Sequence, residues 1–266
     1  MNPKETARRI GLARALSKLG YCSRSQAAEL IRTGSVRVNG GVRRDPETPV
    51  RLTRDRISVD DRPIEAGEKI YLLMNKPRGL VTTASDEKGR DTVYSILKKS
   101  GHPAESGDFS GKVFPWIAPV GRLDKASEGL LLLTNDSEWG ARVAAPETHL
   151  EKTYHVQVAQ VADEILIESL TASVSVEKAG ASETLRARKV RMLRSGQKNC
   201  WLEIVLDEGK NRQIRRMLEA RGVEVLRLVR VAIGPLLLGK LAKGAYRPLT
   251  TDEKKMLDQA MEKGIS

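Results

Sequence analysis

The stretch PVGRLDKASEGLLLLTND, residues 119–136, places Asp124 between two basic residues and shortly before a run of four leucines. An ionised carboxylate that is held in a fixed position can act as a nucleophile or as a general base. Four consecutive leucines are apolar on both faces of a strand, which is typical of a central buried strand that would hold the loop rigidly. The alternative is a surface ion pair of Asp124 with Lys125, since such pairs are common and mostly inert.

A second group of polar residues lies in DEGKNRQIRRMLEARG, residues 207–222, where three arginines crowd one predicted helix. A basic helix face is most often only solvated. Here Gly209, Lys210 and Asn211 precede the helix, so backbone amides and the helix N-terminus could also meet a phosphate. We therefore expect Lys210 and Arg212 to contact a phosphate-bearing partner.

The counts of cysteine and histidine argue against a metal site. The two cysteines, Cys22 and Cys200, and the three histidines do not form a cluster with zinc spacing. Two cysteines cannot form a disulfide framework, which suits a reducing cytoplasm. No apolar run approaches the length of a membrane span, and the first residues lack the apolar core of a secretory signal. We expect a cytoplasmic protein without membrane association.

The positive charge of the chain is concentrated at its start. Residues 1–44 contain ten Lys or Arg and two Glu, and so carry +8 of the formal net charge of +12. Clustered positive charge is typical of a nucleic-acid partner, because neutralised phosphates release condensed counterions. The alternative is a solubilising surface or a basic arm. We favour nucleic acid because the segment is predicted to fold.

The basic segment has the pattern of two helices and a hairpin. Apolar residues at helical spacing predict a first helix over residues 10–19. Ser23 and Gln26 form a capping-box pattern at the start of a second helix, and Gly34 follows its end. The stretch SVRVNGGV, residues 35–42, alternates valines before an Asn-Gly turn, which predicts a hairpin.

This order of elements, with basic side chains outside the apolar positions, resembles the small RNA-binding domain named after the fourth protein of the small ribosomal subunit. The resemblance places that domain at residues 8–62 and implies that the second helix and the following turn contact structured RNA. The residues expected to contact RNA are Arg14, Lys18, Arg24, Arg32, Arg37 and Asn39.

The rest of the chain predicts a second, α+β domain with a mostly antiparallel sheet at residues 68–252, followed by a C-terminal helix at residues 253–266. Residues 98–113 are predicted to form a surface loop. Candidate strands are ISVD, IYLLM, LLLLT, KTYHVQVA, CWLEIVL and VEVLRLVRVAI, and candidate helices are DTVYSILKKS, SEWGARVAAP, ADEILIESLTA and RQIRRMLEARG.

Four segments of this second domain belong together: NKPRGLVTT, GRLDKASEGLLLLTND, EKTYHVQV and DEGKNRQIRRMLEARG. Together they resemble the RsuA-like family of pseudouridine synthases, bacterial ribosomal RNA enzymes of which several carry the same basic module in front. The resemblance implies that a uridine within RNA is converted into pseudouridine without a cofactor or a metal. In that reaction the N-glycosidic bond breaks, the uracil turns in place, and C5 joins C1′ of the ribose.

The resemblance also implies the roles of individual residues. Asp124 matches the catalytic aspartate, and Arg215 is expected to pair with it and to favour its ionised form. Tyr154 matches a tyrosine that stacks on the target uracil, where an aromatic face contributes roughly 1–3 kcal/mol per base. The alternative is a core tyrosine on a sheet strand. Arg122 belongs to the family motif and is expected to contact RNA.

Two other classes of function compete with a ribosomal RNA pseudouridine synthase. One is a non-catalytic ribosome-assembly factor, and the other is an RNA methyltransferase, which would want a Gly-rich cofactor loop that the sequence does not show. The expected partner is ribosomal RNA or a pre-ribosomal particle, and the protein is expected to be a monomer. We favour large-subunit RNA as the target and leave small-subunit RNA open.

Overall fold

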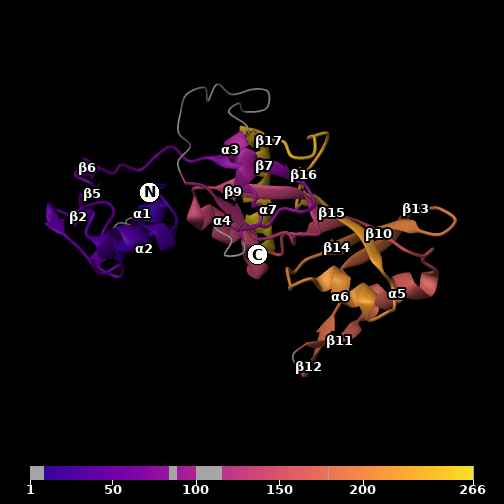
Figure 1. Cartoon of the computed structure of the whole chain (residues 1–266). Coiled ribbons are helices and arrows are strands. Elements are labelled where there is room, and N and C mark those ends of the chain that lie inside the picture. Colours follow the sequence, from indigo (N-terminus) through magenta and orange to yellow (C-terminus); the bar gives the residue numbers. More distant parts are fainter. Residues whose placement is uncertain (1–8, 84–88, 100–115, 179, 266) are drawn as a thin grey trace. The chain divides into compact units, whose positions relative to one another are not determined.

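The computed structural model describes residues 9–83, 89–99, 116–178 and 180–265, and it divides the chain into two compact units (Figure 1). The first unit consists mainly of the chain up to Tyr71, and the second holds most of the chain from Leu72 onward. The surface loop predicted at residues 98–113 falls outside the described residues, apart from its first two.

Two helices begin the first unit, as the sequence predicts. Helix α1 spans Leu12–Lys18 and helix α2 spans Arg24–Thr33. The predicted capping box is present, because the hydroxyl of Ser23 accepts from the Gln26 amide and the Gln26 side chain accepts from the Ser23 amide. Gly34 ends α2 in the left-handed region at φ 88°, which a residue without a Cβ adopts at low cost.

The predicted hairpin follows α2. Strands β2 (Val36–Val38) and β3 (Gly41–Val42) are joined by Asn39 and Gly40, both at positive φ, as a type I′ turn requires. These strands belong to a four-stranded sheet of order β3-β2-β5-β6, whose apolar side packs on α1 and α2. The other strands of the unit are β1 (Ile10–Gly11), β4 (Pro49–Val50), β5 (Ile57–Val59) and β6 (Arg62–Pro63).

A nine-stranded sheet of order β13-β14-β10-β15-β9-β7-β17, with β16 beside β15 and β8 beside β9, forms the main layer of the second unit (Figure 1). The pairs β13–β14, β14–β10, β10–β15 and β17–β7 are antiparallel, and β15 pairs with β9 in parallel. This confirms the predicted α+β fold with a mostly antiparallel sheet. The strands are β7 (Tyr71–Lys76), β8 (Ala118–Val120), β9 (Glu128–Thr134), β10 (Lys152–Val158), β13 (Lys189–Ser195), β14 (Cys200–Leu206), β15 (Val225–Ile233), β16 (Leu236–Leu237) and β17 (Tyr246–Pro248).

Strand β9, which contains the four leucines, lies between β15 and β7, and every residue in it is buried. At its start, Gly129 pairs with Arg230 of the neighbouring strand β15, and the φ of Gly129 is 103°. A Cβ at this position would lie 2.2 Å from the Arg230 carbonyl oxygen, so only glycine permits this approach of the two strands. The close approach anchors the residues that directly follow the Asp124 loop.

Helices α5 and α6 cover one face of the sheet. Their apolar residues share a core with the side chains that β10 and β14 direct toward them, including Val156, Leu202 and Ile204. The helices of the second unit are α3 (Tyr94–Lys99), α4 (Ser137–Ala144), the 3-10 helix η2 (Pro146–Thr148), α5 (Glu164–Ala172), α6 (Gln213–Glu219) and α7 (Thr251–Ile265).

A separate hairpin was not predicted from the sequence. Strands β11 (Val174–Lys178) and β12 (Ala181–Leu185) form a two-stranded sheet of their own between α5 and β13. The inward side chains Val174, Val176 and Leu185 join the core that contains α6. The hairpin is therefore placed beside the helix that carries the arginine cluster.

The C-terminal helix α7 packs on the second unit. Its start is capped by Thr250, whose hydroxyl accepts from the Glu253 amide at 3.1 Å. Leu257 and Met261 are fully buried, and the indole of Trp139 donates to Asp258 at 2.7 Å. Among the described helices, none has the length and apolar character that a bilayer crossing requires.

Candidate active site

Donor groups at the end of β7 and just after it fix the Asp124 loop through its backbone carbonyls. The ammonium group of Lys76 is fully buried and donates to the carbonyl oxygens of Pro77 at 3.2 Å, Asp124 at 3.1 Å and Ser127 at 2.9 Å. Burial lowers the pKa of Lys76 to about 8, against the opposing effect of Asp124 and Glu128. The buried lysine thus acts as an internal brace beneath the loop.

Two further hydrogen bonds hold the loop from the same segment. The Thr82 hydroxyl donates to the Leu123 carbonyl at 2.8 Å, and the Gly79 amide donates to the Lys125 carbonyl at 2.7 Å. The motif NKPRGLVTT, residues 75–83, therefore forms a cradle for the loop. The sequence pattern alone did not predict that this motif supports the loop.

The carboxylate of Asp124 is partly buried, and its ion-pair partner is Arg212, with Nη1 to Oδ2 at 3.5 Å. Arg215 instead donates from Nη2 to the carbonyl oxygen of Ala126 at 3.1 Å. Burial lowers the pKa of Arg215, as does neighbouring Arg212, while the charge of Asp124 opposes both. The expected direct pair of Asp124 with Arg215 is therefore wrong. Arg215 reaches the loop backbone and influences the carboxylate at longer range.

Tyr154 lies on β10, beside the core that α5 and α6 share with the sheet, and lines the same cavity as Asp124. Across from it on β15 is Arg230, which is 5% exposed and donates from Nε to the Leu130 carbonyl at 2.7 Å. Sequence analysis missed Arg230, because a single arginine in an apolar strand normally points to solvent. The feature that identifies Arg230 is its place directly opposite Tyr154 on the neighbouring strand.

The cavity at these residues has a volume of about 420 Å³, enough to enclose a nucleotide-sized group. Among the described residues, Asp124 is the single carboxylate that lines it. Apolar side chains of β14, β15 and α4 complete its wall. A site with this balance of charge favours an anionic ligand and leaves one acidic group to act on it. The basic residues that line the cavity are Arg122, Lys152, Lys210, Arg212, Arg215 and Arg230.

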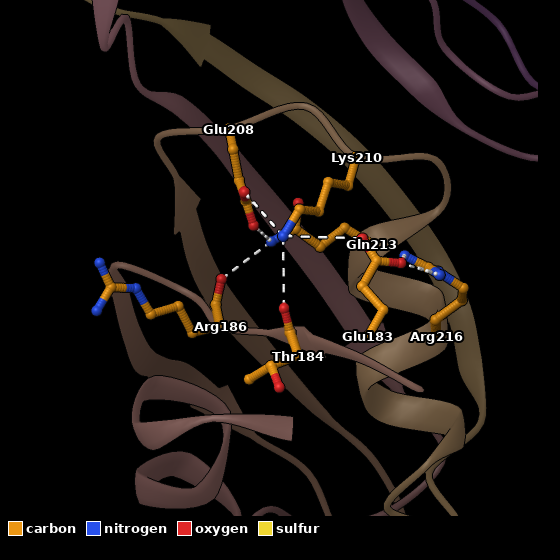
Figure 2. Close-up of polar contacts among 7 residues, drawn as sticks. All are labelled: Glu183, Thr184, Arg186, Glu208, Lys210, Gln213 and Arg216. Atoms are coloured by element: carbon orange, nitrogen blue, oxygen red, sulfur yellow. Dashed lines mark hydrogen bonds and ion pairs between the residues drawn. The ribbon is translucent and has the colours of Figure 1, made fainter. Parts of the chain in front are cut away.

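The predicted phosphate contacts of the second unit are placed differently from one another. Arg122 is exposed at the cavity. The charge of Lys210 is already balanced, since its ammonium lies 3.2 Å from Glu208 and 3.7 Å from Glu183 (Figure 2). Arg212 is held by Asp124. All three are exposed, and Arg122 is the one of them without an ion-pair partner among the described residues.

In the first unit, three predicted RNA-binding residues are exposed on the two helices: Arg14 on α1 and Arg24 and Arg32 on α2. Lys18, in the last turn of α1, is half-buried. Their contact with RNA stays a prediction.

The two predicted contacts in the hairpin have partners within the unit. Arg37 pairs with Asp61 at 2.8 Å. The Asn39 side chain donates to Asp55 at 2.9 Å and accepts from the Arg56 amide at 2.9 Å, so it stabilises the turn itself. Over the described ranges, no group of three or more His, Cys, Asp or Glu side chains could hold a metal ion.

Comparison with known proteins places this geometry in context. Residues 70–220 match the family model "RNA pseudouridylate synthase", and residues 10–65 match that of the S4 domain. The chain is 35% identical over 254 residues to "Ribosomal large subunit pseudouridine synthase B" of Bacillus subtilis, covering 95% of this chain and 97% of that protein. It is also 35% identical over 253 residues to an uncharacterized RNA pseudouridine synthase of Aquifex aeolicus, covering 95% of each. A solved structure, "Crystal structure of pseudouridylate synthase", is similar with a TM-score of 0.60 and 29% identity, over 93% of this chain and 99% of that one.

Proposed function

Since the chain belongs to the RNA pseudouridylate synthase family, we propose that it converts one uridine of large-subunit ribosomal RNA into pseudouridine. The observation that carries the proposal is the placement of one carboxylate, Asp124, in a cavity lined by six basic side chains. The choice of the large subunit rests on the name of the Bacillus subtilis relative, which matches over nearly the whole length of both chains.

In this proposal Asp124 begins the reaction, either by attacking C1′ of the target nucleotide or by removing a proton from its sugar. The bond between N1 and C1′ breaks, and the freed uracil turns within the cavity. A bond then forms between C5 and C1′, the proton leaves C5, and N1 gains a proton, so the reaction is an isomerisation with no net oxidation. Tyr154 stacks on the uracil, while Arg212 holds the carboxylate of Asp124 and Arg215 holds the loop through the Ala126 carbonyl.

We further propose a division of the chain into an RNA-binding domain at residues 8–62, a catalytic domain at residues 68–252 and a C-terminal helix at residues 253–266. Arg122 and the exposed arginines of the first unit would contact RNA phosphates and position the substrate. We expect the protein to act in the cytoplasm as a monomer on ribosomal RNA or a pre-ribosomal particle.

The test is pseudouridine mapping of both ribosomal RNAs in cells with and without this protein. We expect one pseudouridine of the large-subunit RNA to disappear without the protein and to return when it is supplied. Loss of a small-subunit pseudouridine instead would overturn the choice of target. Unchanged maps of both RNAs, together with a defect in ribosome assembly, would favour the non-catalytic assembly factor.

A further inference from the structure

A polar network joins the β11–β12 hairpin to the loop before α6 and to α6 itself (Figure 2). It surrounds Gln213, the first residue of α6, which is 2% exposed. The side-chain amide of Gln213 donates to Glu208 Oε1 at 2.6 Å and to the carbonyl oxygen of Arg186 at 3.0 Å. Both partners are acceptors, so the amide must direct its nitrogen toward them. Gln213 therefore ties the loop to the segment after β12.

The charged members of the network balance one another. The guanidinium of Arg216 donates to one oxygen of Glu183 at 2.7 and 2.8 Å. Lys210 lies between Glu183 and Glu208 and also donates to the Thr184 carbonyl at 3.4 Å. Two cations thus meet two carboxylates. The charges of the network are balanced within it, and its elements come from three separate parts of the chain. Among the described residues, Gln213 Oε1 and Arg216 Nε are buried without a hydrogen-bond partner.

Arg212 stands immediately before Gln213, in the left-handed region at φ 50° and ψ 31°. A residue with a Cβ adopts this conformation at a cost of order 1 kcal/mol or more, and keeps it where the surroundings fix it. No side chain caps α6 at this position. Two backbone hydrogen bonds flank it, from the Gln213 amide to the Lys210 carbonyl at 3.3 Å and from the Arg216 amide to the Arg212 carbonyl at 2.9 Å. The Gln213 side chain adds its bonds to Glu208 and to the Arg186 carbonyl. The same backbone conformation holds the Arg212 guanidinium 3.5 Å from Asp124.

We propose that Gln213 is a positioning residue, which acts with Glu208 and Glu183 to hold Arg212 in its left-handed conformation against Asp124. The role of Arg212 in the reaction rests on the proposed function, whereas the restraint on the loop does not. The inference reassigns Lys210 from a phosphate contact to a part of this network. It also gives the β11–β12 hairpin a role in the network, since β12 carries Glu183, and Arg186, whose carbonyl accepts from Gln213, directly follows β12.

The test compares Gln213→Leu, which keeps the size of the side chain but removes both donors, with Met217→Leu as the matched control. Met217 is 1% exposed on the same helix and packs in the apolar core, so the control change removes no donor or acceptor of the network. At saturating RNA, we expect Gln213→Leu to lower the isomerisation rate about tenfold or more while the RNA dissociation constant changes by less than about threefold. The control should keep the wild-type rate within about twofold at a similar loss of Tm.

A double-mutant cycle separates positioning from general destabilisation. If Gln213 acts through Arg212, Gln213→Leu should cost less than about twofold in rate once Arg212→Gln is present. An equal loss in both backgrounds, or no loss in either, would overturn the inference. If Gln213→Leu does not fold, Glu208→Leu removes the acceptor from a more exposed position, and the same two outcomes decide.

A measurement without substrate keeps this inference distinct from the proposed function. Backbone amide hydrogen exchange over residues 208–213 should be faster in Gln213→Leu than in the wild type and unchanged in Met217→Leu. Equal exchange in the wild type and Gln213→Leu would overturn the restraint, whatever the activity. A wild-type protein that forms no pseudouridine in any ribosomal RNA would count against the proposed function alone.

Discussion

At the scale of residues, the site consists of one carboxylate whose loop is fixed mainly through backbone carbonyls. Lys76 and Arg215 each donate to carbonyl oxygens of the loop, and among the described residues Arg212 is the one that forms an ion pair with the Asp124 side chain. The position of Asp124 is therefore set by groups that do not compete for its carboxylate oxygens. Such a carboxylate is restrained but still available to a substrate.

Which of these residues the sequence reveals depends on whether their neighbours carry a local pattern. Asp124 and Tyr154 stand in recognisable segments, and the structure brings both to one cavity. Lys76 and Arg230 escape notice because a buried cation looks like a surface residue until its carbonyl partners are known. The ion-pair partner of Asp124 is Arg212 rather than the expected Arg215. Arg212 has a positive φ, which no spacing rule predicts.

The buried ammonium of Lys76 makes a prediction about pH. Its pKa of about 8 in the folded protein lies below the ordinary value of 10.5. Between these values the unfolded chain holds a proton that the folded protein has released, so the contribution of Lys76 to stability rises with pH in this window. The unfolding free energy of the wild type minus that of Lys76→Met should rise by on the order of 3 kcal/mol from pH 8 to pH 10.5. Denaturant titrations of both proteins measure it, and a difference that shrinks with rising pH would contradict the assignment.

At the scale of elements, the strongest sequence patterns gave the right structures. The capping box of α2, the Asn-Gly hairpin and the all-leucine strand β9 each combine several signals that agree, and all three are present. The β11–β12 hairpin and strand β13 were missed, since most of their side chains are exposed or polar and their apolar alternation is weak. The hairpin packs beside α6, which is distant in sequence, whereas β13 is close to its partner β14 and was missed because most of its side chains are not buried.

The start of helix α7 is stabilised by contacts of the Glu253 carboxylate. Glu253 accepts two hydrogen bonds from Arg247, at 2.6 and 2.7 Å, and one from the Thr250 amide at 2.9 Å. The bond from Arg247 is the main cause that lowers the pKa of Glu253. We expect Glu253→Gln to lower the unfolding free energy by about 1–2 kcal/mol at neutral pH.

The effect of Glu253 should depend on pH in one direction. A carboxyl whose pKa is lowered by folding stabilises the protein above its unfolded pKa and loses that contribution as pH falls through the folded one. The gap between the wild type and Glu253→Gln should therefore close on acidification. Glu168→Gln, an exposed change on α5, serves as the control and should show little effect at any pH. A gap that persists below pH about 3 would show that the charge is not the cause.

At the scale of the whole molecule, the uneven distribution of charge suggests separate tasks for affinity and chemistry. Residues 1–44 carry most of the net positive charge, and Arg14 and Arg24 are exposed on their helices. The sequence alone shows this distribution of charge. It could not show that Arg37 and Asn39 are used within the first unit, because their partners lie 24 and 16 residues away in the chain.

The salt dependence of RNA binding tests this division. Each lost phosphate contact should reduce the slope of log K against log salt by about 0.7 to 0.9. We expect the variant Arg14→Gln/Arg24→Gln to lose about 1.4 to 1.8 from the slope while the rate at saturating RNA stays near that of the wild type. The variant Lys255→Gln/Lys263→Gln removes the same charge from exposed positions on α7 and should leave the slope unchanged. Equal slopes for the two variants would mean that general charge, rather than these two arginines, drives binding.

The central claim is that Asp124 performs the chemistry of this site, and the most direct measurement is tritium release from RNA that contains C5-labelled uridine. Asp124→Asn removes the anionic carboxylate and nearly preserves its shape, so RNA binding should persist while release falls by several orders of magnitude. Asp252→Asn, an exposed change at the start of α7, should release tritium at the wild-type rate. Release by Asp124→Asn at a rate near that of the wild type would contradict the account.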